Sequence, residues 1–386
     1  MVRNIQMKSN LMLVTWNYPP KIGGMEQLLF QLVQQVQSDV STFVLAPYCG
    51  DKDYINEAGI SRSYRKGLLG FFWHVWVKGN HLLKTEEIDV IMGGSALVTP
   101  LVYLLSRKHN IPGTIYAHGL DLIYRNPVYQ LIIRAILPRM ARIFVNSSQT
   151  KLTAINIGVT ENRIKIIHPG IHSAEYRSSE EQIVIRRRYS LEAKKVIMYA
   201  GRLAKRKGVL EFIKYSLPEV VRQHDDVIFC IIGGNPEKSL HHKENMRQQI
   251  EQEIEIQGLE DHVQLLGWVD RKVLLDMYSA CDIFLLPAIP VPGDMEGFGI
   301  VLAEANAAGK PVVSTQIGGI SDAVVDGKSA ILVDPESWNE YSSAIIKLLD
   351  NPDLRIKMGE FGALRVSKEL DWSFIGNEFS REIKSL

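Results

Sequence analysis

Residues 196–208 read VIMYAGRLAKRKG. Its first part, Val196–Ala200, is a short apolar run of the kind that forms a buried strand. The loop that follows carries Arg202 and Lys207 between two glycines, and a segment with helical spacing comes next. A strand that runs through such a loop into a helix is typical of a parallel βαβ unit. The stretch therefore predicts an α/β fold.

Similar apolar runs, bounded by glycine, proline, asparagine or aspartate, recur along the chain in two series. The first series consists of Leu11–Trp16, Thr42–Pro47, Ile88–Gly94, Thr114–His118, Arg142–Ser147 and Ile164–His168. The second consists of Val196–Ala200, Val227–Gly233, Val263–Gly267, Ile283–Pro287, Pro311–Thr315 and Ala330–Val333. A polar stretch from His172 to Lys195 separates the two series and is typical of a linker with a short helix. We therefore expect two parallel sheets, one in each half of the chain.

Length and composition also favour two domains. The chain has 386 residues, of which 46% are apolar and 23% charged. Since domains usually hold about 150 residues, this length favours two of them. We expect an N-terminal domain at 1–175 and a C-terminal domain at 176–370, with a last helix at about 371–386 that packs back on the first domain. The formal net charge of +1 argues against nucleic acid as a partner.

The cysteines and the start of the chain indicate a cytoplasmic protein. Cys49, Cys230 and Cys281 are widely separated and lack metal-ligand spacing, so reduced thiols are expected. Residues 1–10 are polar and do not resemble a signal peptide. No apolar run approaches the roughly 18 residues that a membrane-spanning helix needs. Peripheral attachment to the cytoplasmic face of the inner membrane remains open.

Two strand-to-helix turns carry groups suited to a phosphate. Gly23 and Gly24 precede a helical segment, so backbone amides and the helix N-terminus could approach an anion there. Arg202 and Lys207 lie on a loop that leads into another helix, where they could clamp a diphosphate. Each turn has a plain alternative, because the glycines could form an ordinary turn and the cations a solvated basic loop.

A third turn lies between two carboxylates. Glu296 and Glu304 enclose seven residues where glycines precede an alanine-rich segment. If a helix begins near Phe298, Glu296 lies beside its first amides and Glu304 about two turns inside it. Both carboxylates could then accept hydrogen bonds from vicinal hydroxyls, one from a sugar and one from a ribose. They could also be solvent-facing glutamates, but Glu304 lies in an apolar run, where a carboxylate needs a partner.

The order and spacing of these motifs resemble a large family of retaining glycosyltransferases, the family 4-like enzymes with the GT-B fold that include phosphatidylinositol mannosyltransferase. The resemblance covers nearly the whole chain and is strongest over 201–334. Its motifs are Gly23–Glu26, His118–Asp121, Asn146–Ser148, His168–Gly170, Gly201–Gly208, Glu296–Glu304, and Gly318–Ile320 before Asp334-Pro335.

The resemblance implies a fold and an activity. The fold is two Rossmann-like βαβ domains that face each other across a cleft. The activity is transfer of a hexose from a nucleotide sugar to a lipid-linked or glycan acceptor, as in the biosynthesis of cell-envelope polysaccharides.

The resemblance also implies roles for the matching residues of the second half. Arg202 and Lys207 would bind the donor diphosphate. Glu296 would hold hydroxyls of the transferred sugar, and Glu304 would bind the ribose. The other donor contacts implied there are Phe298, Gly299 and Ile300, and, around the base, Gly233, Trp268, Val269 and Asp270.

In the first half, the resemblance places Gly23 and Gly24 against the donor phosphates. His118 would lie near the reacting carbon and the acceptor, with Asp121 one turn further on. His118 could instead be a buried structural histidine at the end of a strand.

The implied chemistry needs neither a metal nor another cofactor. Negative charge grows on the leaving diphosphate, and fixed cations stabilise that charge more in the transition state than in the ground state. No carboxylate stands out as a covalent nucleophile in the family pattern. The resemblance therefore suggests a front-face transfer in which the leaving phosphate accepts the proton of the acceptor. The sequence Asp51-Lys52-Asp53 spells the DxD of metal-dependent enzymes, but it follows a first-domain strand, and we expect a surface loop there.

The segment 62–84 combines cations with aromatic residues, which suits the interface of an anionic membrane. Its candidate membrane or acceptor contacts are Arg62, Arg65, Lys66, Phe71, Phe72 and Trp73. Packing in the core explains the same aromatic residues. Lipid-modifying members of the family that the sequence resembles carry a basic amphipathic helix at this place. The resemblance therefore favours contact with a membrane and a lipid acceptor.

The sequence is compatible with several other functions. Nucleotide-sugar 2-epimerases share the fold, and a non-catalytic nucleotide-sugar binder would share the donor contacts. A Rossmann oxidoreductase is disfavoured, because neither half carries GxGxxG with an acidic residue about twenty positions on. The resemblance leans towards GDP-mannose, whose guanine amino group could bind Asp270, but UDP-hexoses stay open.

Overall fold

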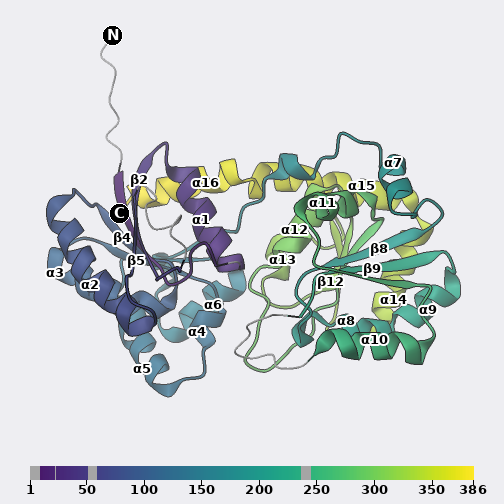
Figure 1. Cartoon of the computed structure of the whole chain (residues 1–386), viewed down its shortest axis with the longest axis horizontal. Coiled ribbons are helices and arrows are strands. Elements are labelled where there is room, and N and C mark those ends of the chain that lie inside the picture. The colour runs from purple at the N-terminus through teal and green to yellow at the C-terminus, as the bar shows by residue number, and fades with distance from the viewer. Residues whose placement is uncertain (1–8, 22, 51–58, 236–244) are drawn as a thin grey trace, which may run out of the picture. The chain divides into compact units, whose positions relative to one another are not determined.

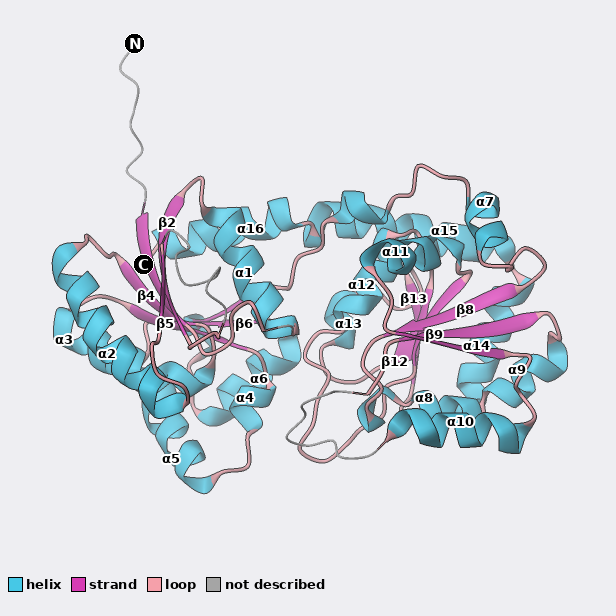
Figure 2. Ribbon diagram, in the orientation of Figure 1, coloured by secondary structure: helices cyan, strands magenta, loops and turns pink. Residues whose placement is uncertain are grey.

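The computed structural model of the chain describes residues 9–21, 23–50, 59–235 and 245–386. The chain divides into two compact units, which are residues 1–170 with 372–386 (unit 1) and residues 171–371 (unit 2). Each unit is a parallel β-sheet with helices on both faces (Figures 1 and 2). No helix among the described residues is both long and apolar enough to cross a bilayer.

Unit 1 contains a sheet of seven strands in the order β3-β2-β1-β4-β5-β6-β7. These strands are β1 (Ser9–Val14), β2 (Val40–Ala46), β3 (Ile60–Arg62), β4 (Val90–Gly93), β5 (Gly113–Ala117), β6 (Arg142–Val145) and β7 (Ile164–Ile166). All the runs of the first series form strands. The short edge strand β3 was not predicted, because three residues are too few to show a period.

The helices of unit 1 are α1 (Gly24–Val36), α2 (Leu68–Thr85), α3 (Thr99–His109), α4 (Leu120–Ile123), α5 (Pro127–Ile136), α6 (Ser148–Ile157) and the C-terminal α16 (Trp372–Lys384). Alternate residues of β1 face opposite sides of the sheet. Leu11 and Leu13 belong to the core formed with α1 and α16, which lie side by side (Figure 1). Met12 and Val14 belong to the core formed with α2, α3 and α5.

Unit 2 contains a sheet of six strands in the order β10-β9-β8-β11-β12-β13. These are β8 (Lys195–Ala200), β9 (Val227–Ile232), β10 (Val263–Gly267), β11 (Ile283–Leu286), β12 (Val312–Thr315) and β13 (Ala330–Val333), as the second series predicts. Its helices are α7 (Gln182–Arg188), α8 (Val209–Tyr215), α9 (Leu217–Gln223), α10 (Met246–Gln257), α11 (Arg271–Ala280), α12 (Ile300–Ala307), α13 (Ile320–Ala323), α14 (Trp338–Asp350) and α15 (Pro352–Arg365).

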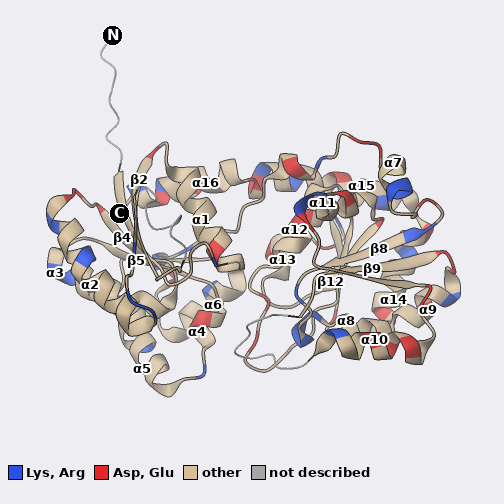
Figure 3. Cartoon of the chain, in the orientation of Figure 1, with Lys and Arg blue, Asp and Glu red and all other residues tan. Residues whose placement is uncertain are grey.

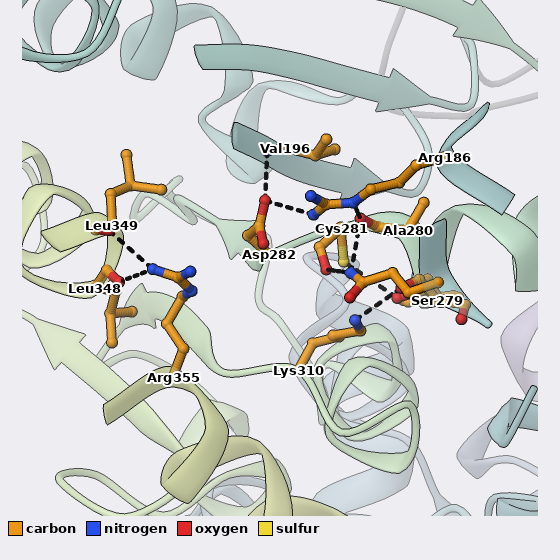
Figure 4. A network of polar contacts seen from close by, with 12 residues as sticks. Arg186, Val196, Ser279, Ala280, Cys281, Asp282, Lys310, Leu348, Leu349 and Arg355 are labelled. Carbon is orange, nitrogen blue, oxygen red and sulfur yellow. Dashed lines mark hydrogen bonds and ion pairs between the residues drawn. The ribbon is translucent and has the colours of Figure 1, made fainter. Parts of the chain in front are cut away.

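A polar network holds the N-terminal ends of β8 and β11 in unit 2 (Figure 4). The Arg186 guanidinium lies 2.7 Å from Asp282 Oδ2 and donates through Nε to the Ala280 carbonyl at 2.9 Å. Lys310 Nζ donates to the Ser279 carbonyl at 2.8 Å. Because cations are stabilised at a helix C-terminus, these contacts fasten α7 and the loop after α12 to the end of α11. The network lies at the edge of the sheet away from the strand ends where ligands bind.

Candidate active site

The strand order of unit 2 reverses between β8 and β11, which are neighbours in the sheet. Open α/β sheets bind ligands at the carboxyl ends of their strands at such a switch point. The loop after β8 ends at Gly208, whose φ is +67°. A Cβ at Gly208 would collide with the carbonyl of Pro287, at the start of the loop after β11. Glycine therefore lets the two loops meet at the switch point.

Four charged side chains of these two loops form a buried cluster. Lys207 Nζ donates to Glu296 Oε2 at 2.7 Å, and Arg206 donates to the same oxygen. Arg206 Nε also lies 3.2 Å from Asp294 Oδ1. The side chains are only 10% exposed in Arg206, 9% in Lys207 and 10% in Glu296. We call Arg206, Lys207, Asp294 and Glu296 the strand-end cluster.

Burial and charge act in opposite directions on the groups of the strand-end cluster. Burial by itself raises the pKa of Glu296, but Lys207 and Arg206 overcome that effect and lower it from 4.5 to about 2. Burial lowers the pKa of Lys207, and Glu296 only partly offsets the change. Glu296 is therefore an ionised hydrogen-bond acceptor at neutral pH and a weak base.

The backbone around Glu296 is also held firmly. The Glu296 carbonyl accepts a hydrogen bond from Gly319 N at 2.9 Å, and a Cβ at Gly318 would collide with the same carbonyl. The following helix α12 begins at Ile300, close to the predicted start, after a buried Phe298 and a left-handed Gly299. The first amides of α12 therefore follow directly on Glu296.

Glu304 lies inside α12 and has the partners that its apolar surroundings demand. Tyr278 donates to Glu304 Oε2 at 2.8 Å, and Tyr176 is a second hydrogen-bond partner. Burial raises the pKa of Glu304, and the two tyrosines and Arg271 oppose that rise. Arg271 also donates to the Tyr176 hydroxyl at 3.1 Å. A ligand hydroxyl at Glu304 would therefore join an existing network.

The residues predicted to surround the base lie at the ends of β9 and β10. Gly233 N donates to the Gly267 carbonyl at 2.7 Å, and a Cβ at Gly233 would collide with the Gly201 carbonyl. The strand ends of β8, β9 and β10 therefore pack closely. Trp268 is 63% exposed, and Val269 is half-buried against the core of unit 2.

Asp270 is the N-cap residue of α11. Its Oδ1 accepts a hydrogen bond from Val273 N at 2.8 Å and caps the N-terminus of α11. An aspartate at this position is a common helix cap. A donor on the base would have to share this carboxylate with the cap.

Arg202 differs from the other cations of its loop. It is exposed, and it forms no ion pair with any residue that the structure describes. Its carbonyl accepts a hydrogen bond from the Tyr199 hydroxyl at 2.8 Å, which fixes the loop at the end of β8. The Arg202 guanidinium therefore extends from a fixed backbone position.

His118 follows β5 in unit 1 and is 7% exposed. Its Nε2 lies 2.8 Å from the Gly94 carbonyl, which can only accept, so Nε2 carries the proton and Nδ1 is the acceptor in the neutral ring. Gly94 N in turn donates to the carbonyl of Val14 at the end of β1. His118 therefore lies beside the point between β1 and β4 where the strand order of unit 1 reverses.

Asp121 binds backbone amides on two sides. Its Oδ1 accepts from His118 N at 2.9 Å and its Oδ2 from Ala96 N at 2.8 Å. Asn146 approaches the same turn, with Nδ2 3.5 Å from the His118 carbonyl. The structure thus favours Asp121 as a residue that positions the His118 turn, rather than one that reacts itself.

Gly23 and Gly24 lie at the start of α1, as predicted. A carboxylate is already present there, because a Cβ at Gly23 would collide with Glu26 Oε2. Asn17 Nδ2 holds the other oxygen of Glu26 at 2.8 Å. Lys21 lies 4.4 Å from the centre of the Trp16 ring. The turn therefore contains charged groups of its own beside the glycines.

The segment 62–84 divides between core and surface. Arg62 is 5% exposed in β3 and Phe71 is fully buried, so the expectation that these two contact a membrane is corrected. The edge strand turns Arg62 inward, and the helical period of α2 places Phe71 on the face that packs against the sheet. Phe72 is half-buried against the same core. Arg65, Lys66 and the 63% exposed Trp73 remain on the surface.

No group of three or more His, Cys, Asp or Glu side chains within the described ranges could hold a metal ion. Asp51 and Asp53 of the DxD sequence lie outside those ranges.

Two family models match the chain. The model described as Glycosyltransferase Family 4 matches residues 22–175, and the one described as Glycosyl transferases group 1 matches residues 181–365. Together the two models cover most of the chain, which belongs to the glycosyltransferase family that they describe.

Relatives of known name match the glycosyltransferase along most of its length. A GDP-mannose-dependent alpha-(1-6)-phosphatidylinositol monomannoside mannosyltransferase of Mycobacterium tuberculosis is 26% identical, over 94% of this chain and 95% of the relative. An alpha-D-kanosaminyltransferase of Streptomyces kanamyceticus is 25% identical, over 83% of each chain.

Solved structures establish the GT-B fold. The Anabaena protein HepE, crystallised with UDP, aligns with a TM-score of 0.81 at 19% identity, over 98% of this chain and 100% of that one. A sucrose-phosphate synthase from Thermosynechococcus elongatus aligns with a TM-score of 0.79 at 21% identity, over 98% and 99% of the two chains.

Sequence reasoning missed several residues of the candidate site. Arg206 and Asp294 were passed over although they complete the strand-end cluster, and Tyr176 and Tyr278 were not linked to Glu304. The run 205–207 held a signal for Arg206, because it places three adjacent cations in one loop at the end of a predicted strand. No comparable signal in the sequence marked the tyrosines, which come from distant segments.

Proposed function

We propose that this glycosyltransferase transfers a hexose from a nucleoside-diphosphate sugar to a lipid-linked or glycan acceptor, with retention of configuration. The observation that carries the proposal is the pairing of Lys207 and Arg206 with Glu296 in the strand-end cluster at the switch point of unit 2. The exposed Arg202 lies on the same loop. Cations suited to a diphosphate and a carboxylate suited to sugar hydroxyls are thus together at one edge of the sheet.

The charges of the cluster suit the breaking of a bond to diphosphate. As the sugar leaves, negative charge accumulates on the diphosphate, and Arg202 and Lys207 would stabilise it without a metal ion. Glu296 would accept hydrogen bonds from the sugar hydroxyls. Its lowered pKa of about 2 keeps it ionised for that role and makes it a poor proton acceptor.

We therefore assign the proton of the acceptor hydroxyl to the leaving phosphate. The acceptor oxygen forms the new bond to the anomeric carbon on the face from which the phosphate departs. The phosphate oxygen that loses the sugar takes the proton, so no group of the protein changes its protonation state. His118 has its Nε2 proton committed to Gly94. In this proposal it contributes polar contacts near the reacting carbon rather than a proton.

Two observations bear on the donor. The name of the mycobacterial relative favours GDP-mannose, and the UDP bound to HepE supports a UDP-hexose. We favour GDP-mannose because that relative is the more similar of the two in sequence, 26% against 19% identical.

The donor is tested by a thermal-shift panel of UDP-, GDP- and ADP-sugars, since a ligand that binds the folded state raises apparent stability by mass action. We expect the largest shift with GDP-mannose. Release of nucleoside diphosphate that depends on an acceptor then identifies a transferase. Release of an epimerised sugar nucleotide would contradict the proposal, and an absence of both release and slow hydrolysis would identify a binder.

The helical side of unit 1 formed by α2, α3 and α5 suits an anionic lipid surface. These helices contain no aspartate or glutamate (Figure 3), and α3 packs against both of the others. Exposed apolar side chains lie on this side, with Leu69 85%, Trp73 63% and Leu131 72% exposed. Arg125 and Arg134 line a hollow of about 470 Å³ beside α5. We propose that this side meets the membrane that carries a lipid acceptor.

Flotation with liposomes tests the membrane proposal. We expect the protein to float with vesicles of phosphatidylglycerol and phosphatidylcholine and to stay behind with phosphatidylcholine alone. The R65E/K66E variant should float much less. The variant K347E/K357E changes the net charge equally at exposed sites of unit 2, so it should float like the wild type. Equal flotation of both variants, or no flotation of the wild type, would refute the membrane contact.

A further inference from the structure

The strand-end cluster contains one more cation than the donor contacts require. Lys207 has one carboxylate partner in the cluster, Glu296, whereas Arg206 reaches both Glu296 and Asp294. The two cations also share a single oxygen, Oε2 of Glu296. The two positive and two negative charges balance when no ligand is bound. A diphosphate that draws Lys207 away must therefore leave Glu296 with another partner.

We propose that Arg206 is a positioning residue, which keeps Glu296 paired in place so that Lys207 can move to the donor diphosphate. This inference rests on the proposed function. The geometry supports it because Arg206 bridges two carboxylates from one loop, and a guanidinium can hold two acceptors at once. Lys207 is a point charge on a flexible chain and, among the described residues, pairs with Glu296 alone, so it is the cation that can turn.

The energetic reason is the cost of an unpaired buried charge. Removing one partner from a buried ion pair is strongly destabilising, because the other charge then lacks both water and a counter-ion. With Arg206 present, Glu296 retains one cation when Lys207 leaves. Without Arg206, Glu296 would hold Lys207, and the diphosphate would have to compete for it.

A role of Arg206 through Glu296 predicts that a second substitution restores the affinity lost in an Arg206 variant. A direct contact of Arg206 with the phosphate predicts no such rescue. If Arg206 acts through Glu296, the loss of affinity in R206M disappears when the carboxylate is removed as well. If Arg206 touched the phosphate itself, its removal would weaken binding whether or not the carboxylate were present.

Isothermal titration with UDP and with GDP tests the prediction, since these ligands lack the sugar that Glu296 would hold. We expect R206M to weaken the better-bound nucleotide by about tenfold or more. The double variant R206M/E296Q should bind within about threefold of E296Q alone. K207M should lower nucleotide affinity both in the wild-type protein and in the E296Q variant. Unchanged affinity in R206M, or a loss that persists in R206M/E296Q, would overturn the role of Arg206.

The R206K variant guards against a failure of R206M to fold. A lysine keeps the charge but can serve only one of the two carboxylates well, so R206K should show a smaller loss that E296Q again removes. Thermal unfolding of each variant confirms that the titrated protein is folded. If the wild type binds neither UDP nor GDP, the proposed function itself fails and this inference falls with it. A wild type that binds normally, together with an absent rescue, rejects only the inference.

Discussion

Glu296 makes the stability of unit 2 depend on pH. Its pKa in the folded protein is about 2, below the ordinary 4.5, because Lys207 and Arg206 outweigh the effect of burial. A carboxyl with a depressed pKa contributes stability that is complete above its unfolded pKa and is lost as the pH falls towards the folded one. We therefore expect the free energy of unfolding to fall between pH 4.5 and about 2.

Urea titrations at several pH values measure this dependence. In E296Q, the slope of unfolding free energy against pH should be shallower across that window, even if the variant is less stable at neutral pH. A slope identical to that of the wild type would show that Glu296 is not held ionised by its two cations.

A single substitution at His118 tests its role in turnover. If it contacts the sugar near the reacting carbon, H118A should lower turnover by about a hundredfold, because small errors in position near a reacting centre are costly. The control is H109A, at the end of α3 and away from the turn at His118. Steady-state assays with the donor found in the panel provide the measurement. Near-normal turnover in a folded H118A would leave His118 a structural role only.

At the scale of elements, Asp270 shows how one residue can serve a helix rather than a ligand. Its Oδ1 caps α11 through Val273 N, and loss of such a cap costs about 1 kcal/mol. We expect D270A to lower the free energy of unfolding by that amount. D270N should remain close to the wild type, because asparagine caps equally well.

The same pair of variants tests the predicted contact with guanine. If the carboxylate serves the cap alone, D270N should bind GDP and UDP in the wild-type ratio. Isothermal titration measures that ratio, and a selective loss of GDP affinity would restore the predicted contact with guanine.

At the scale of the whole molecule, the chain enters unit 2 after Gly170 and leaves it after Asp371. The first and last residues of unit 2 are hydrogen-bonded to each other. Ile171 N donates to the Leu370 carbonyl at 2.7 Å, and Ser173 Oγ donates to Asp371 Oδ2 at 2.6 Å. The next residue, Trp372, begins α16 and is 4% exposed in the core of unit 1.

The last helix should therefore matter for the stability of unit 1. A Cβ at Gly170 would collide with the Trp372 ring, so that ring fills the space beside a residue that must be small. We expect W372A to lower the stability of unit 1 by about 3 to 5 kcal/mol, as for other buried aromatic truncations. F374A, which removes a 43% exposed ring from the same helix, should have a small effect. Calorimetry that shows equal losses of stability in W372A and F374A would contradict this prediction for α16.

Much of the fold could be predicted because it depends on local patterns. Apolar runs such as Leu11–Trp16 and Val196–Ala200 form buried parallel strands wherever they occur, since both faces of such a sheet are covered. The edge strand β3 was missed, because three residues carry no period. Within 62–84, composition could not separate Arg62 and Phe71 from Trp73. The burial of Phe71 and Trp73 depends on which face of α2 meets the sheet, and that of Arg62 on the pairing of β3 with β2.

Local sequence patterns were enough to predict two βαβ series, their strand-end loops and the motifs of a glycosyltransferase. The partners of the charges became known from the folded chain: Arg206 and Asp294 around Glu296, Tyr176 and Tyr278 on Glu304, and two backbone amides on Asp121. The physical reason is that strand periodicity is read within a few residues. The partner of a buried charge is set by which distant loops the strand order β8-β11 places side by side.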